Sequence, residues 1–497
     1  MIGVILAAGV GSRLRPLTNK KPKCLINTAW KPILQYQFDA YREAGINEIC
    51  IVVGYEGKSV ITYCKHIKNF KIEIVENPDY ENTNNMYSLY LARDIVKNKP
   101  FILNNADLSI DSKIIQKLCE SNEPNLVAVD GNVYNEESMK VSIDETGFIN
   151  DISKEMRRDN AFGCSIDIYK FSKESCEIFF SKIIDIVENE NNKKDWTEVA
   201  MQRLFKSREL KFKPYDISGL NWVEIDDFHD LSVSDKLFSN FSTWSKDITT
   251  YYFDLDGTLC IGDQLIEGAN EIITKLKSDG KSIYFLSNNS SNSKSNYVKF
   301  FHDLGIECSA ENIILSTDGV IDFLKKRQVK NVYVMGTKSL VKVFIDEGFE
   351  IDTHAPEYVI ISYDKELTYN KLATACRLVN SGVDYIITHP DVFCPSGDGP
   401  IPDAGAIGNM IEITTSRKPA LVFGKPSPDM VLHHMREHGY AADQCIMVGD
   451  RLHTDIEMAK NAGMKSILVL SGETSRTMVE NINSKPDVIL NTVADIY

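Results

Sequence analysis

The sequence predicts an α/β protein with two doubly wound domains. Twice, an apolar stretch of strand length runs directly into a glycine-rich or aspartate-rich turn, at Gly3–Ala8 and again at Tyr251–Phe253. Elsewhere, apolar runs of strand length alternate with segments whose apolar residues recur every 3.6 positions. This alternation is typical of parallel sheets with helical crossovers. The length of 497 residues agrees, because globular domains usually hold about 100–200 residues.

The first domain is expected over residues 1–238. After its opening strand we expect helices at Ile33–Ala44 and Met86–Val96, and buried strands at Ile49–Val53, Ile72–Val75 and Phe101–Leu103. The polar stretch 239–249 is predicted to be a linker, because apolar periodicity lapses there. The second domain follows over 250–497, with an inserted α/β cap at about 313–418 between two sets of aspartate-rich motifs.

Composition excludes several classes of protein. Asp and Glu outnumber Lys and Arg by 70 to 55, and the net charge of −15 argues against nucleic acid or an anionic membrane as a partner. No apolar run reaches the ~18–20 residues of a membrane-spanning helix. Met1–Leu6 is predicted to be a buried strand rather than a signal peptide. The 11 scattered cysteines lack zinc-type pairs and predict reduced thiols in a cytoplasmic protein.

The turn after the first strand carries the richest motif of the chain. Glycines let backbone N–H groups approach a polyphosphate without obstruction by Cβ atoms. Arg13 and Lys23 then supply cations for the charge that grows as pyrophosphate leaves. The spacing fits neither a P-loop nor a dinucleotide fingerprint. The predicted nucleotide-binding residues are Leu6, Ala7, Ala8, Gly9, Gly11, Ser12, Arg13 and Lys23.

With this motif, roughly the first 235 residues resemble the nucleotidyltransferase superfamily. The resemblance is closest to CTP:phosphocholine cytidylyltransferases, and it rests further on Val53–Tyr55, Asn84–Leu89, Asn105–Asp107 and Trp222–Asp226. It implies a Rossmann-like domain that joins CTP to a small phosphorylated alcohol. In-line attack by the acceptor phosphate on the α-phosphorus would release pyrophosphate, and an anionic nucleophile needs no general base.

Two aspartates of this half are candidate ligands of Mg²⁺. Asp107 and Asp226 each follow an apolar strand, so they should lie at strand carboxyl ends, where α/β folds bind ligands. Carboxylate oxygens suit this hard cation, and the resemblance assigns both residues to it. Asp227 competes for the second position.

The acceptor is less well defined by the sequence. Lys140 and Lys154 are candidates for holding its phosphate. A choline-type head group would require aromatic or acidic side chains around a cation, for which the available residues are Tyr87, Trp196, Glu198 and Tyr215. A phosphorylated polyol or an aminoalkyl phosphonate stays an alternative acceptor.

Four motifs follow apolar strands in the second half. Asp254 and Asp256 stand two residues apart, as required for a carboxylate nucleophile and a proton donor. Downstream come Ser287 with Asn288, then Lys425, and finally Asp450 in Gly449–Asp455.

This set resembles the haloacid dehalogenase superfamily, and the position of the insertion resembles the type IIA phosphatases. The resemblance implies that Asp254 is the nucleophile, Asp256 the general acid and base, and Lys425 the neutralising cation. It implies that Ser287 and Asn288 bind the phosphoryl group. Mg²⁺ would be held by Asp254, Asp256 through its carbonyl, and Asp450, with support from Asp455.

The sequence therefore predicts one bifunctional enzyme. A cytidylyltransferase acting on a phosphocholine-like alcohol is joined to a Mg²⁺-dependent phosphatase for a phosphate monoester, within one pathway to a CDP-activated alcohol. The alternatives are transfer to a sugar-1-phosphate, a glycerol phosphate or an aminoalkyl phosphonate, or a role for one domain as a binding module only. Whether the chain forms a homo-oligomer is left open.

Overall fold

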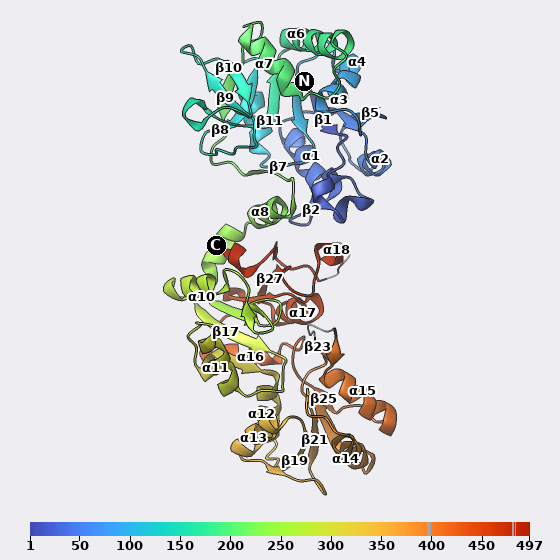
Figure 1. The fold of residues 1–497 in the computed structure, drawn as a ribbon, viewed down its shortest axis with the longest axis vertical. Coiled ribbons are helices and arrows are strands. Elements are labelled where there is room, and N and C mark those ends of the chain that lie inside the picture. Colours follow the sequence, from blue (N-terminus) through green and yellow to red (C-terminus); the bar gives the residue numbers. More distant parts are fainter. Residues whose placement is uncertain (395–398, 480–481, 483) are drawn as a thin grey trace. The chain divides into compact units, whose positions relative to one another are not determined.

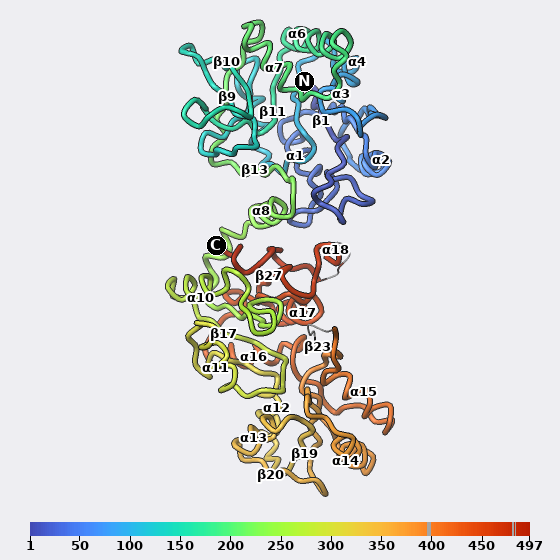
Figure 2. The backbone as a smooth tube through the Cα atoms, viewed as in Figure 1, coloured from blue at the N-terminus to red at the C-terminus, as the bar shows by residue number. Residues whose placement is uncertain are grey.

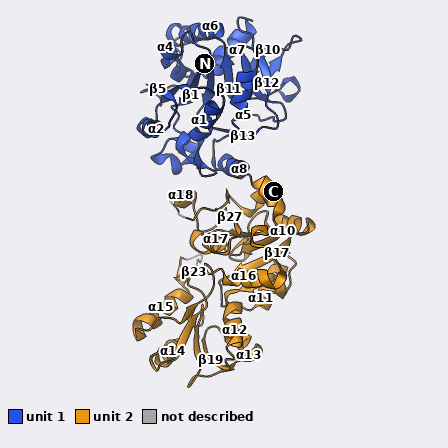
Figure 3. Ribbon diagram, turned by 180° about the vertical axis from the view of Figure 1, so that it is seen from behind, with its two compact units in different colours: residues 1–238 blue, residues 239–497 orange. Residues whose placement is uncertain are grey.

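The protein divides into two compact units, residues 1–238 and 239–497 (Figures 1 and 3). The computed structural model describes residues 1–394, 399–479, 482 and 484–497. Both units are α/β, which confirms the predicted fold class. No helix among these residues is long and apolar enough to cross a membrane.

The first unit is built on a mixed nine-stranded sheet. Its continuous order is β10-β9-β11-β6-β1-β4-β5, and β8 pairs with β11 and β12. The parallel part contains the predicted strands, which the structure bounds as β1 (Ile2–Ala7), β4 (Glu48–Val53), β5 (Lys71–Glu76) and β6 (Phe101–Asn105). The antiparallel part comprises β8 (Leu126–Asp130), β9 (Lys140–Ile143), β10 (Ile149–Ser153) and β11 (Gly163–Phe171), while β12 (Lys213–Asp216) pairs in parallel with β8.

Helices cover both faces of this sheet and bury two apolar clusters against it. They are α1 (Ile33–Glu43), α2 (Gly57–Cys64), α3 (Asn85–Leu91), α4 (Arg93–Val96), α5 (Lys113–Glu120), α6 (Lys173–Ile184) and α7 (Thr197–Lys206). A further helix, α8 (Phe228–Phe238), packs in a separate apolar cluster with Leu14 and Ile26. The helix predicted over Met86–Val96 is divided at Ala92 into α3 and α4. Two ribbons complete the unit, β2 (Asn27–Thr28) with β3 (Lys31–Pro32) and β7 (Leu108–Ile110) with β13 (Trp222–Glu224).

The second unit has a parallel six-stranded core sheet of order β18-β17-β14-β26-β27-β28. Its strands are β14 (Thr250–Asp254), β17 (Ser282–Ser287), β18 (Ile313–Leu315), β26 (Cys445–Gly449), β27 (Lys465–Val469) and β28 (Val488–Leu490). The helices of this core are α10 (Ala269–Ser278), α11 (Lys294–Asp303), α16 (Asp429–His438), α17 (Glu457–Ala462) and α18 (Arg476–Val479). A small ribbon pairs β15 (Cys260–Ile261) with β16 (Gln264–Leu265).

A separate five-stranded sheet forms the inserted cap, with order β20-β19-β21-β22-β25. The chain leaves the core after β18, forms α12 (Ser316–Lys326), whose buried residues pack with those of the cap sheet, builds this sheet and returns before α16 (Figure 2). Its strands are β19 (Asn331–Met335), β20 (Glu350–Ile351), β21 (Tyr358–Ile361), β22 (Asp384–Ile387) and β25 (Leu421–Val422), and its helices are α13 (Lys338–Asp346), α14 (Tyr369–Asn380) and α15 (Ala404–Thr415). Beside it, β23 (Phe393–Cys394) pairs with β24 (Ile401–Pro402).

The insertion begins later than the sequence predicts. Its expected start at residue 313 falls on β18, which pairs with β17 and so belongs to the core sheet. Its expected end at residue 418 falls before β25, which pairs with β22 as a strand of the cap. Apolar strands of the cap and of the core share one pattern, so periodicity alone could not separate them.

The predicted linker is part of the second unit. Residues 239–249 contain α9 (Phe241–Trp244) and a 3₁₀ turn, and Phe241 and Ile248 are buried in the apolar cluster of that unit. The polar side chains between them face solvent, which explains the lapse in periodicity.

We expect Phe241→Ala to lower the free energy of unfolding of the second unit by about 3–5 kcal/mol, because it empties a packed site. Lys246→Ala removes an exposed side chain of the same segment and should change it by less than about 0.5 kcal/mol. Denaturant titration of both variants measures the difference. If both substitutions change the free energy of unfolding equally, residues 239–249 form a linker that does not pack on the second unit.

Candidate active sites

In the first unit, the glycine turn after β1 wraps around Lys23. Gly11 has a φ of 64°, and a Cβ atom there would lie 2.8 Å from the Cβ of Lys23. The following 3₁₀ turn, Ser12–Leu14, presents Arg13. Gly11 is therefore required by both backbone conformation and close packing.

Lys23 lies between two aspartates from distant parts of the chain. Its Nζ donates to Asp107 Oδ2 at 2.9 Å and to Asp226 Oδ1 at 2.8 Å. Arg13 reaches Asp226 Oδ2 at 2.9 Å. Burial disfavours the charged form of Lys23 and would lower its pKa. The carboxylates of Asp107 and Asp226 stabilise the charged form more strongly, so the pKa of the lysine is raised. Arg13, Lys23, Asp107 and Asp226 thus form one connected network of ion pairs.

Three carboxylates of this site can hold a cation. Ligand atoms of Asp107, Glu224 and Asp226 lie within 4.8 Å of one another, and Asp107 Oδ1 is buried with no hydrogen-bond partner. Burial and then the charges of the two aspartates raise the pKa of Glu224 to about 8. A divalent ion fits this donor set. Asp227 instead accepts from the N–H groups of residues 229 and 230, at the start of α8.

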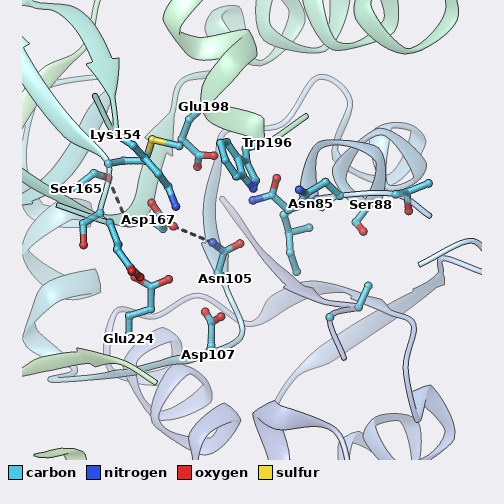
Figure 4. Close-up of a pocket in the computed structure, with 18 of the residues that line it drawn as sticks. Asn85, Ser88, Asn105, Asp107, Lys154, Ser165, Asp167, Trp196, Glu198 and Glu224 are labelled. Carbon is cyan, nitrogen blue, oxygen red and sulfur yellow. Dashed lines mark hydrogen bonds between the residues drawn. The ribbon is translucent and has the colours of Figure 1, made fainter. Parts of the chain in front are cut away.

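A cavity of about 280 Å³ opens beside these groups (Figure 4). Of the predicted nucleotide- and metal-binding residues, Leu6, Ala8, Gly9 and Asp107 line it, and so do the acceptor candidates Lys154, Trp196 and Glu198. The sequence analysis missed several other residues of its wall as site residues, although Asn85, Asn105 and Glu224 stand within the motifs it used. The remaining wall includes Asn77, Tyr80, Asn84, Ser88, Glu137, Ser165 and Asp167.

The two candidate phosphate-binding lysines differ in their surroundings. Lys140 is 1% exposed and donates to the carbonyls of Asn135 and Glu136, so it supports a loop and does not line the cavity. Lys154 does line the cavity, with its Nζ 4.8 Å from the centre of the Trp196 ring.

The four residues that the sequence offers for a choline head group do not all converge on this cavity. Trp196 and Glu198 line the cavity, but Tyr87 and Tyr215 are not among its lining residues. Tyr87 instead stacks on Tyr90 with ring centroids 5.7 Å apart.

In the second unit, Lys425 also lies between two aspartates. Its Nζ donates to Asp254 Oδ1 and, at 2.7 Å, to Asp455 Oδ1. All three residues are buried. Burial opposes the charge of Lys425, yet both carboxylates raise its pKa. Asp254 ends β14, while Lys425 follows β25 of the cap, so the return of the chain from the insertion places this cation.

Asp450 completes a second group of carboxylates. Ligand atoms of Asp254, Asp450 and Asp455 lie within 4.8 Å of one another, and Asp450 Oδ1 is buried without a partner. Burial and then the charge of Asp254 raise the pKa of Asp450 to about 8. This donor set also fits a divalent cation. Gly257 has a φ of 86°, and a Cβ atom there would lie 2.5 Å from Asp450 Oδ2.

Asp256 differs from Asp254 in its exposure. Asp254 is buried and Asp256 is exposed to solvent. The surrounding protein and then the charge of Asp254 raise the pKa of Asp256. A carboxyl group that keeps its proton more readily than usual suits a general acid.

Asn288 links the core to the cap. Its Oδ1 accepts from the Lys425 N–H at 2.8 Å, and its Nδ2 donates to Asp391 Oδ2 at 3.1 Å. The neighbouring Ser287 Oγ accepts from the N–H of Asn289. Asn288 therefore contacts the lysine segment, and Ser287 precedes it at the end of β17. The sequence analysis did not assign Asp391 this contact.

Comparison with known proteins identifies both units. Residues 2–140 match the nucleotidyl transferase family, and residues 251–350 match the haloacid dehalogenase-like hydrolase family, with a second hydrolase match of this kind over 422–496. The second unit is 35% identical over 246 residues to the sugar-phosphatase AraL of Bacillus subtilis, covering 49% of this chain and 90% of the relative. The chain belongs to the haloacid dehalogenase-like hydrolases. Its first unit is a nucleotidyltransferase domain.

Two further relatives agree with this assignment. The acid sugar phosphatase of Staphylococcus aureus is 31% identical over 244 residues, which cover 48% of this chain and 93% of the relative. The structure of 4-nitrophenylphosphatase from Thermotoga maritima is 38% identical, with a TM-score of 0.50 over 51% of this chain and 97% of that one. The chain thus combines a transferase unit with a phosphatase-type hydrolase unit of the type IIA branch.

Lys425→Met should lower the free energy of unfolding of the second unit by about 3–5 kcal/mol in the absence of divalent cations, because buried carboxylates lose their counter-charge. Lys342→Met removes an exposed partner of Asp346 and should cost less than about 1 kcal/mol. Denaturant titration with a chelator present measures both. If Lys425→Met and Lys342→Met have the same free energy of unfolding, the claim that Lys425 neutralises the buried carboxylates is wrong.

Proposed function

We propose that the first unit transfers the cytidylyl group of CTP to a small phosphorylated alcohol and releases pyrophosphate. The observation that carries this proposal is the convergence of Arg13, Lys23, Asp107 and Asp226 beside one cavity, under the glycine turn. Cations and exposed backbone N–H groups suit a triphosphate, and the cavity has room for a small acceptor.

The reaction is an in-line displacement. An oxygen of the acceptor phosphate forms a bond to the α-phosphorus of CTP, and the bond from that phosphorus to the bridging oxygen breaks. Arg13 and Lys23 offset the charge on the departing pyrophosphate, while the glycine turn binds and orients the triphosphate. Lys154, which lines the cavity, would hold the acceptor phosphate.

Asp107, Glu224 and Asp226 would hold Mg²⁺ in this unit. When bound, the ion offsets the charge of the phosphates. The preference for CTP rests on the glycine-turn motif together with Asn84–Leu89 and Asn105–Asp107, which resemble the CTP:phosphocholine cytidylyltransferases.

For the second unit we propose hydrolysis of a phosphate monoester through a phosphorylated aspartate. Asp254 Oδ forms a bond to phosphorus while the ester oxygen leaves with a proton from Asp256. Water then attacks the phosphoaspartate, Asp256 takes the proton, and inorganic phosphate leaves. Lys425, Ser287 and Asn288 hold the phosphoryl oxygens. Asp254, Asp450 and the carbonyl of Asp256 would bind Mg²⁺, with Asp455 in support.

The relatives of the second unit are named sugar phosphatases, which favours a sugar phosphate or a similar small ester as its substrate. Both activities handle small phosphate esters, so we place them in one pathway to a CDP-activated alcohol. The 11 cysteines are all free, which supports a cytoplasmic location.

The acceptor can be identified with the Asp254→Asn variant, which cannot destroy phosphate esters. Pyrophosphate release with CTP and Mg²⁺ should appear with phosphocholine, phosphoethanolamine or a glycerol phosphate. Lys23→Met should lower kcat/KM by about 10²–10³-fold, because a charge-stabilising group is lost. Turnover only with a sugar-1-phosphate, or only with another nucleotide, would contradict the proposal.

Hydrolysis of p-nitrophenyl phosphate separates the two aspartates of the second unit. Nitrophenolate leaves without a proton, so Asp256→Asn should give a burst of one equivalent and then turnover slowed by about 10²–10⁴-fold. Asp254→Asn should give neither burst nor turnover. A burst from Asp254→Asn would exclude this residue as the nucleophile.

A further inference from the structure

The side chain of Asn288 holds the backbone of the buried lysine in the second unit. Its Oδ1 accepts from the Lys425 N–H at 2.8 Å, and its Nδ2 donates to the Lys425 carbonyl at 3.1 Å. A main-chain N–H can only donate, so it fixes which end of the amide faces it. Both residues are buried, so little water competes for these bonds. The placement of the Lys425 backbone therefore depends on the orientation of one amide.

A cap residue holds the same amide from the other side. Asn288 Nδ2 also donates to Asp391 Oδ2 at 3.1 Å, and this second bond uses the remaining hydrogen of the amide. Any contact of Asn288 with a phosphoryl oxygen is thereby left to its main chain. Asp391 follows β22 of the cap, and Asn288 follows β17 of the core. The bond thus connects the cap to the segment that positions Lys425.

Asp391 is itself held in place within the cap. Its carbonyl accepts from the Gly405 N–H at 2.8 Å, near the start of α15. A Cβ atom at residue 405 would lie 2.1 Å from the carbonyl oxygen of Pro390, so the two segments pack closely. On the core side, Arg451 Nη1 lies 3.7 Å from Asp391 Oδ2. The carboxylate is therefore a fixed acceptor at the boundary between cap and core.

We propose that Asp391 is a positioning residue of the phosphatase unit. Through its bond to Asn288 it orients the amide that holds Lys425, whose Nζ lies between Asp254 and Asp455. This role does not require Asp391 to touch the substrate. A misplacement of about 1 Å in a reacting site can cost about 100-fold in rate. The inference rests on the phosphatase function proposed above and gives the cap a part in placing the group that neutralises the phosphoryl charge.

Hydrolysis of p-nitrophenyl phosphate by the full chain tests the inference. Asp391→Ala removes the acceptor and should lower kcat by about 10–100-fold, with KM changed by less than about threefold, because Lys425 acts on charge that develops in the transition state. Asp391→Asn keeps an oxygen that accepts from Asn288 and should restore most of the lost kcat. Asp384→Ala breaks an exposed ion pair with Arg417 inside the cap, and this matched control should keep the wild-type kcat.

A double-mutant cycle shows whether the effect passes through Asn288. Adding Asp391→Ala to Asn288→Ala should lower kcat by less than about twofold further, because the bond is already lost. Denaturant titration checks that the second unit of each variant is folded in the assay.

Three results would each overturn the inference alone. They are a kcat of Asp391→Ala equal to that of the control, an equal loss in Asp391→Asn and Asp391→Ala, and additive losses in the cycle with Asn288→Ala. No hydrolysis by the wild-type chain would overturn the phosphatase proposal and the inference with it.

Discussion

In each unit, one largely buried lysine lies between two aspartates that the fold brings from distant parts of the chain. Lys23 joins the glycine turn to the carboxylates of Asp107 and Asp226, and Lys425 joins the returning cap segment to Asp254 at the end of β14 and to Asp455. Taking an isolated carboxylate out of water costs several kcal/mol, so the buried Asp254 and Asp455 depend on Lys425 for their charge. In the first unit, Lys23 stabilises two partly exposed aspartates, one of which also pairs with Arg13. The lysine is therefore a condition for assembling the site as well as a group that contacts phosphate.

Both clusters keep more carboxylates than the lysine can neutralise. Asp107 and Asp450 each retain a buried oxygen without a hydrogen-bond partner, and the pKa values of Glu224 and Asp450 are raised to about 8. These carboxyl groups would be stabilised in their charged form by a further cation beside them. The proposed Mg²⁺ ions would provide it at the place where the phosphates arrive, so the two units apply one electrostatic scheme to two different bond-breaking steps.

The sequence located the parts of the sites that depend on local pattern. Asp107 and Asp254 come at or just after the ends of buried strands, and periodicity predicts where such strands end. Periodicity could not locate Asp167 in the cavity wall. This residue has left-handed backbone within a register shift between β11 and β8, and strand register depends on tertiary pairing rather than on the local sequence. Nor could periodicity separate Lys140 from Lys154, since the difference lies in which way each side chain turns. The boundaries of the cap were missed for the same reason, as strand pairing decides membership of a sheet.

The central claim is that each lysine serves the chemistry of its own unit. Pyrophosphate release and phosphate release, measured side by side on Lys23→Met and Lys425→Met at saturating Mg²⁺, test this claim most directly. The account predicts that Lys23→Met loses transfer and keeps hydrolysis, and that Lys425→Met does the opposite. Loss of both activities in either variant, with both units still folded, would contradict it.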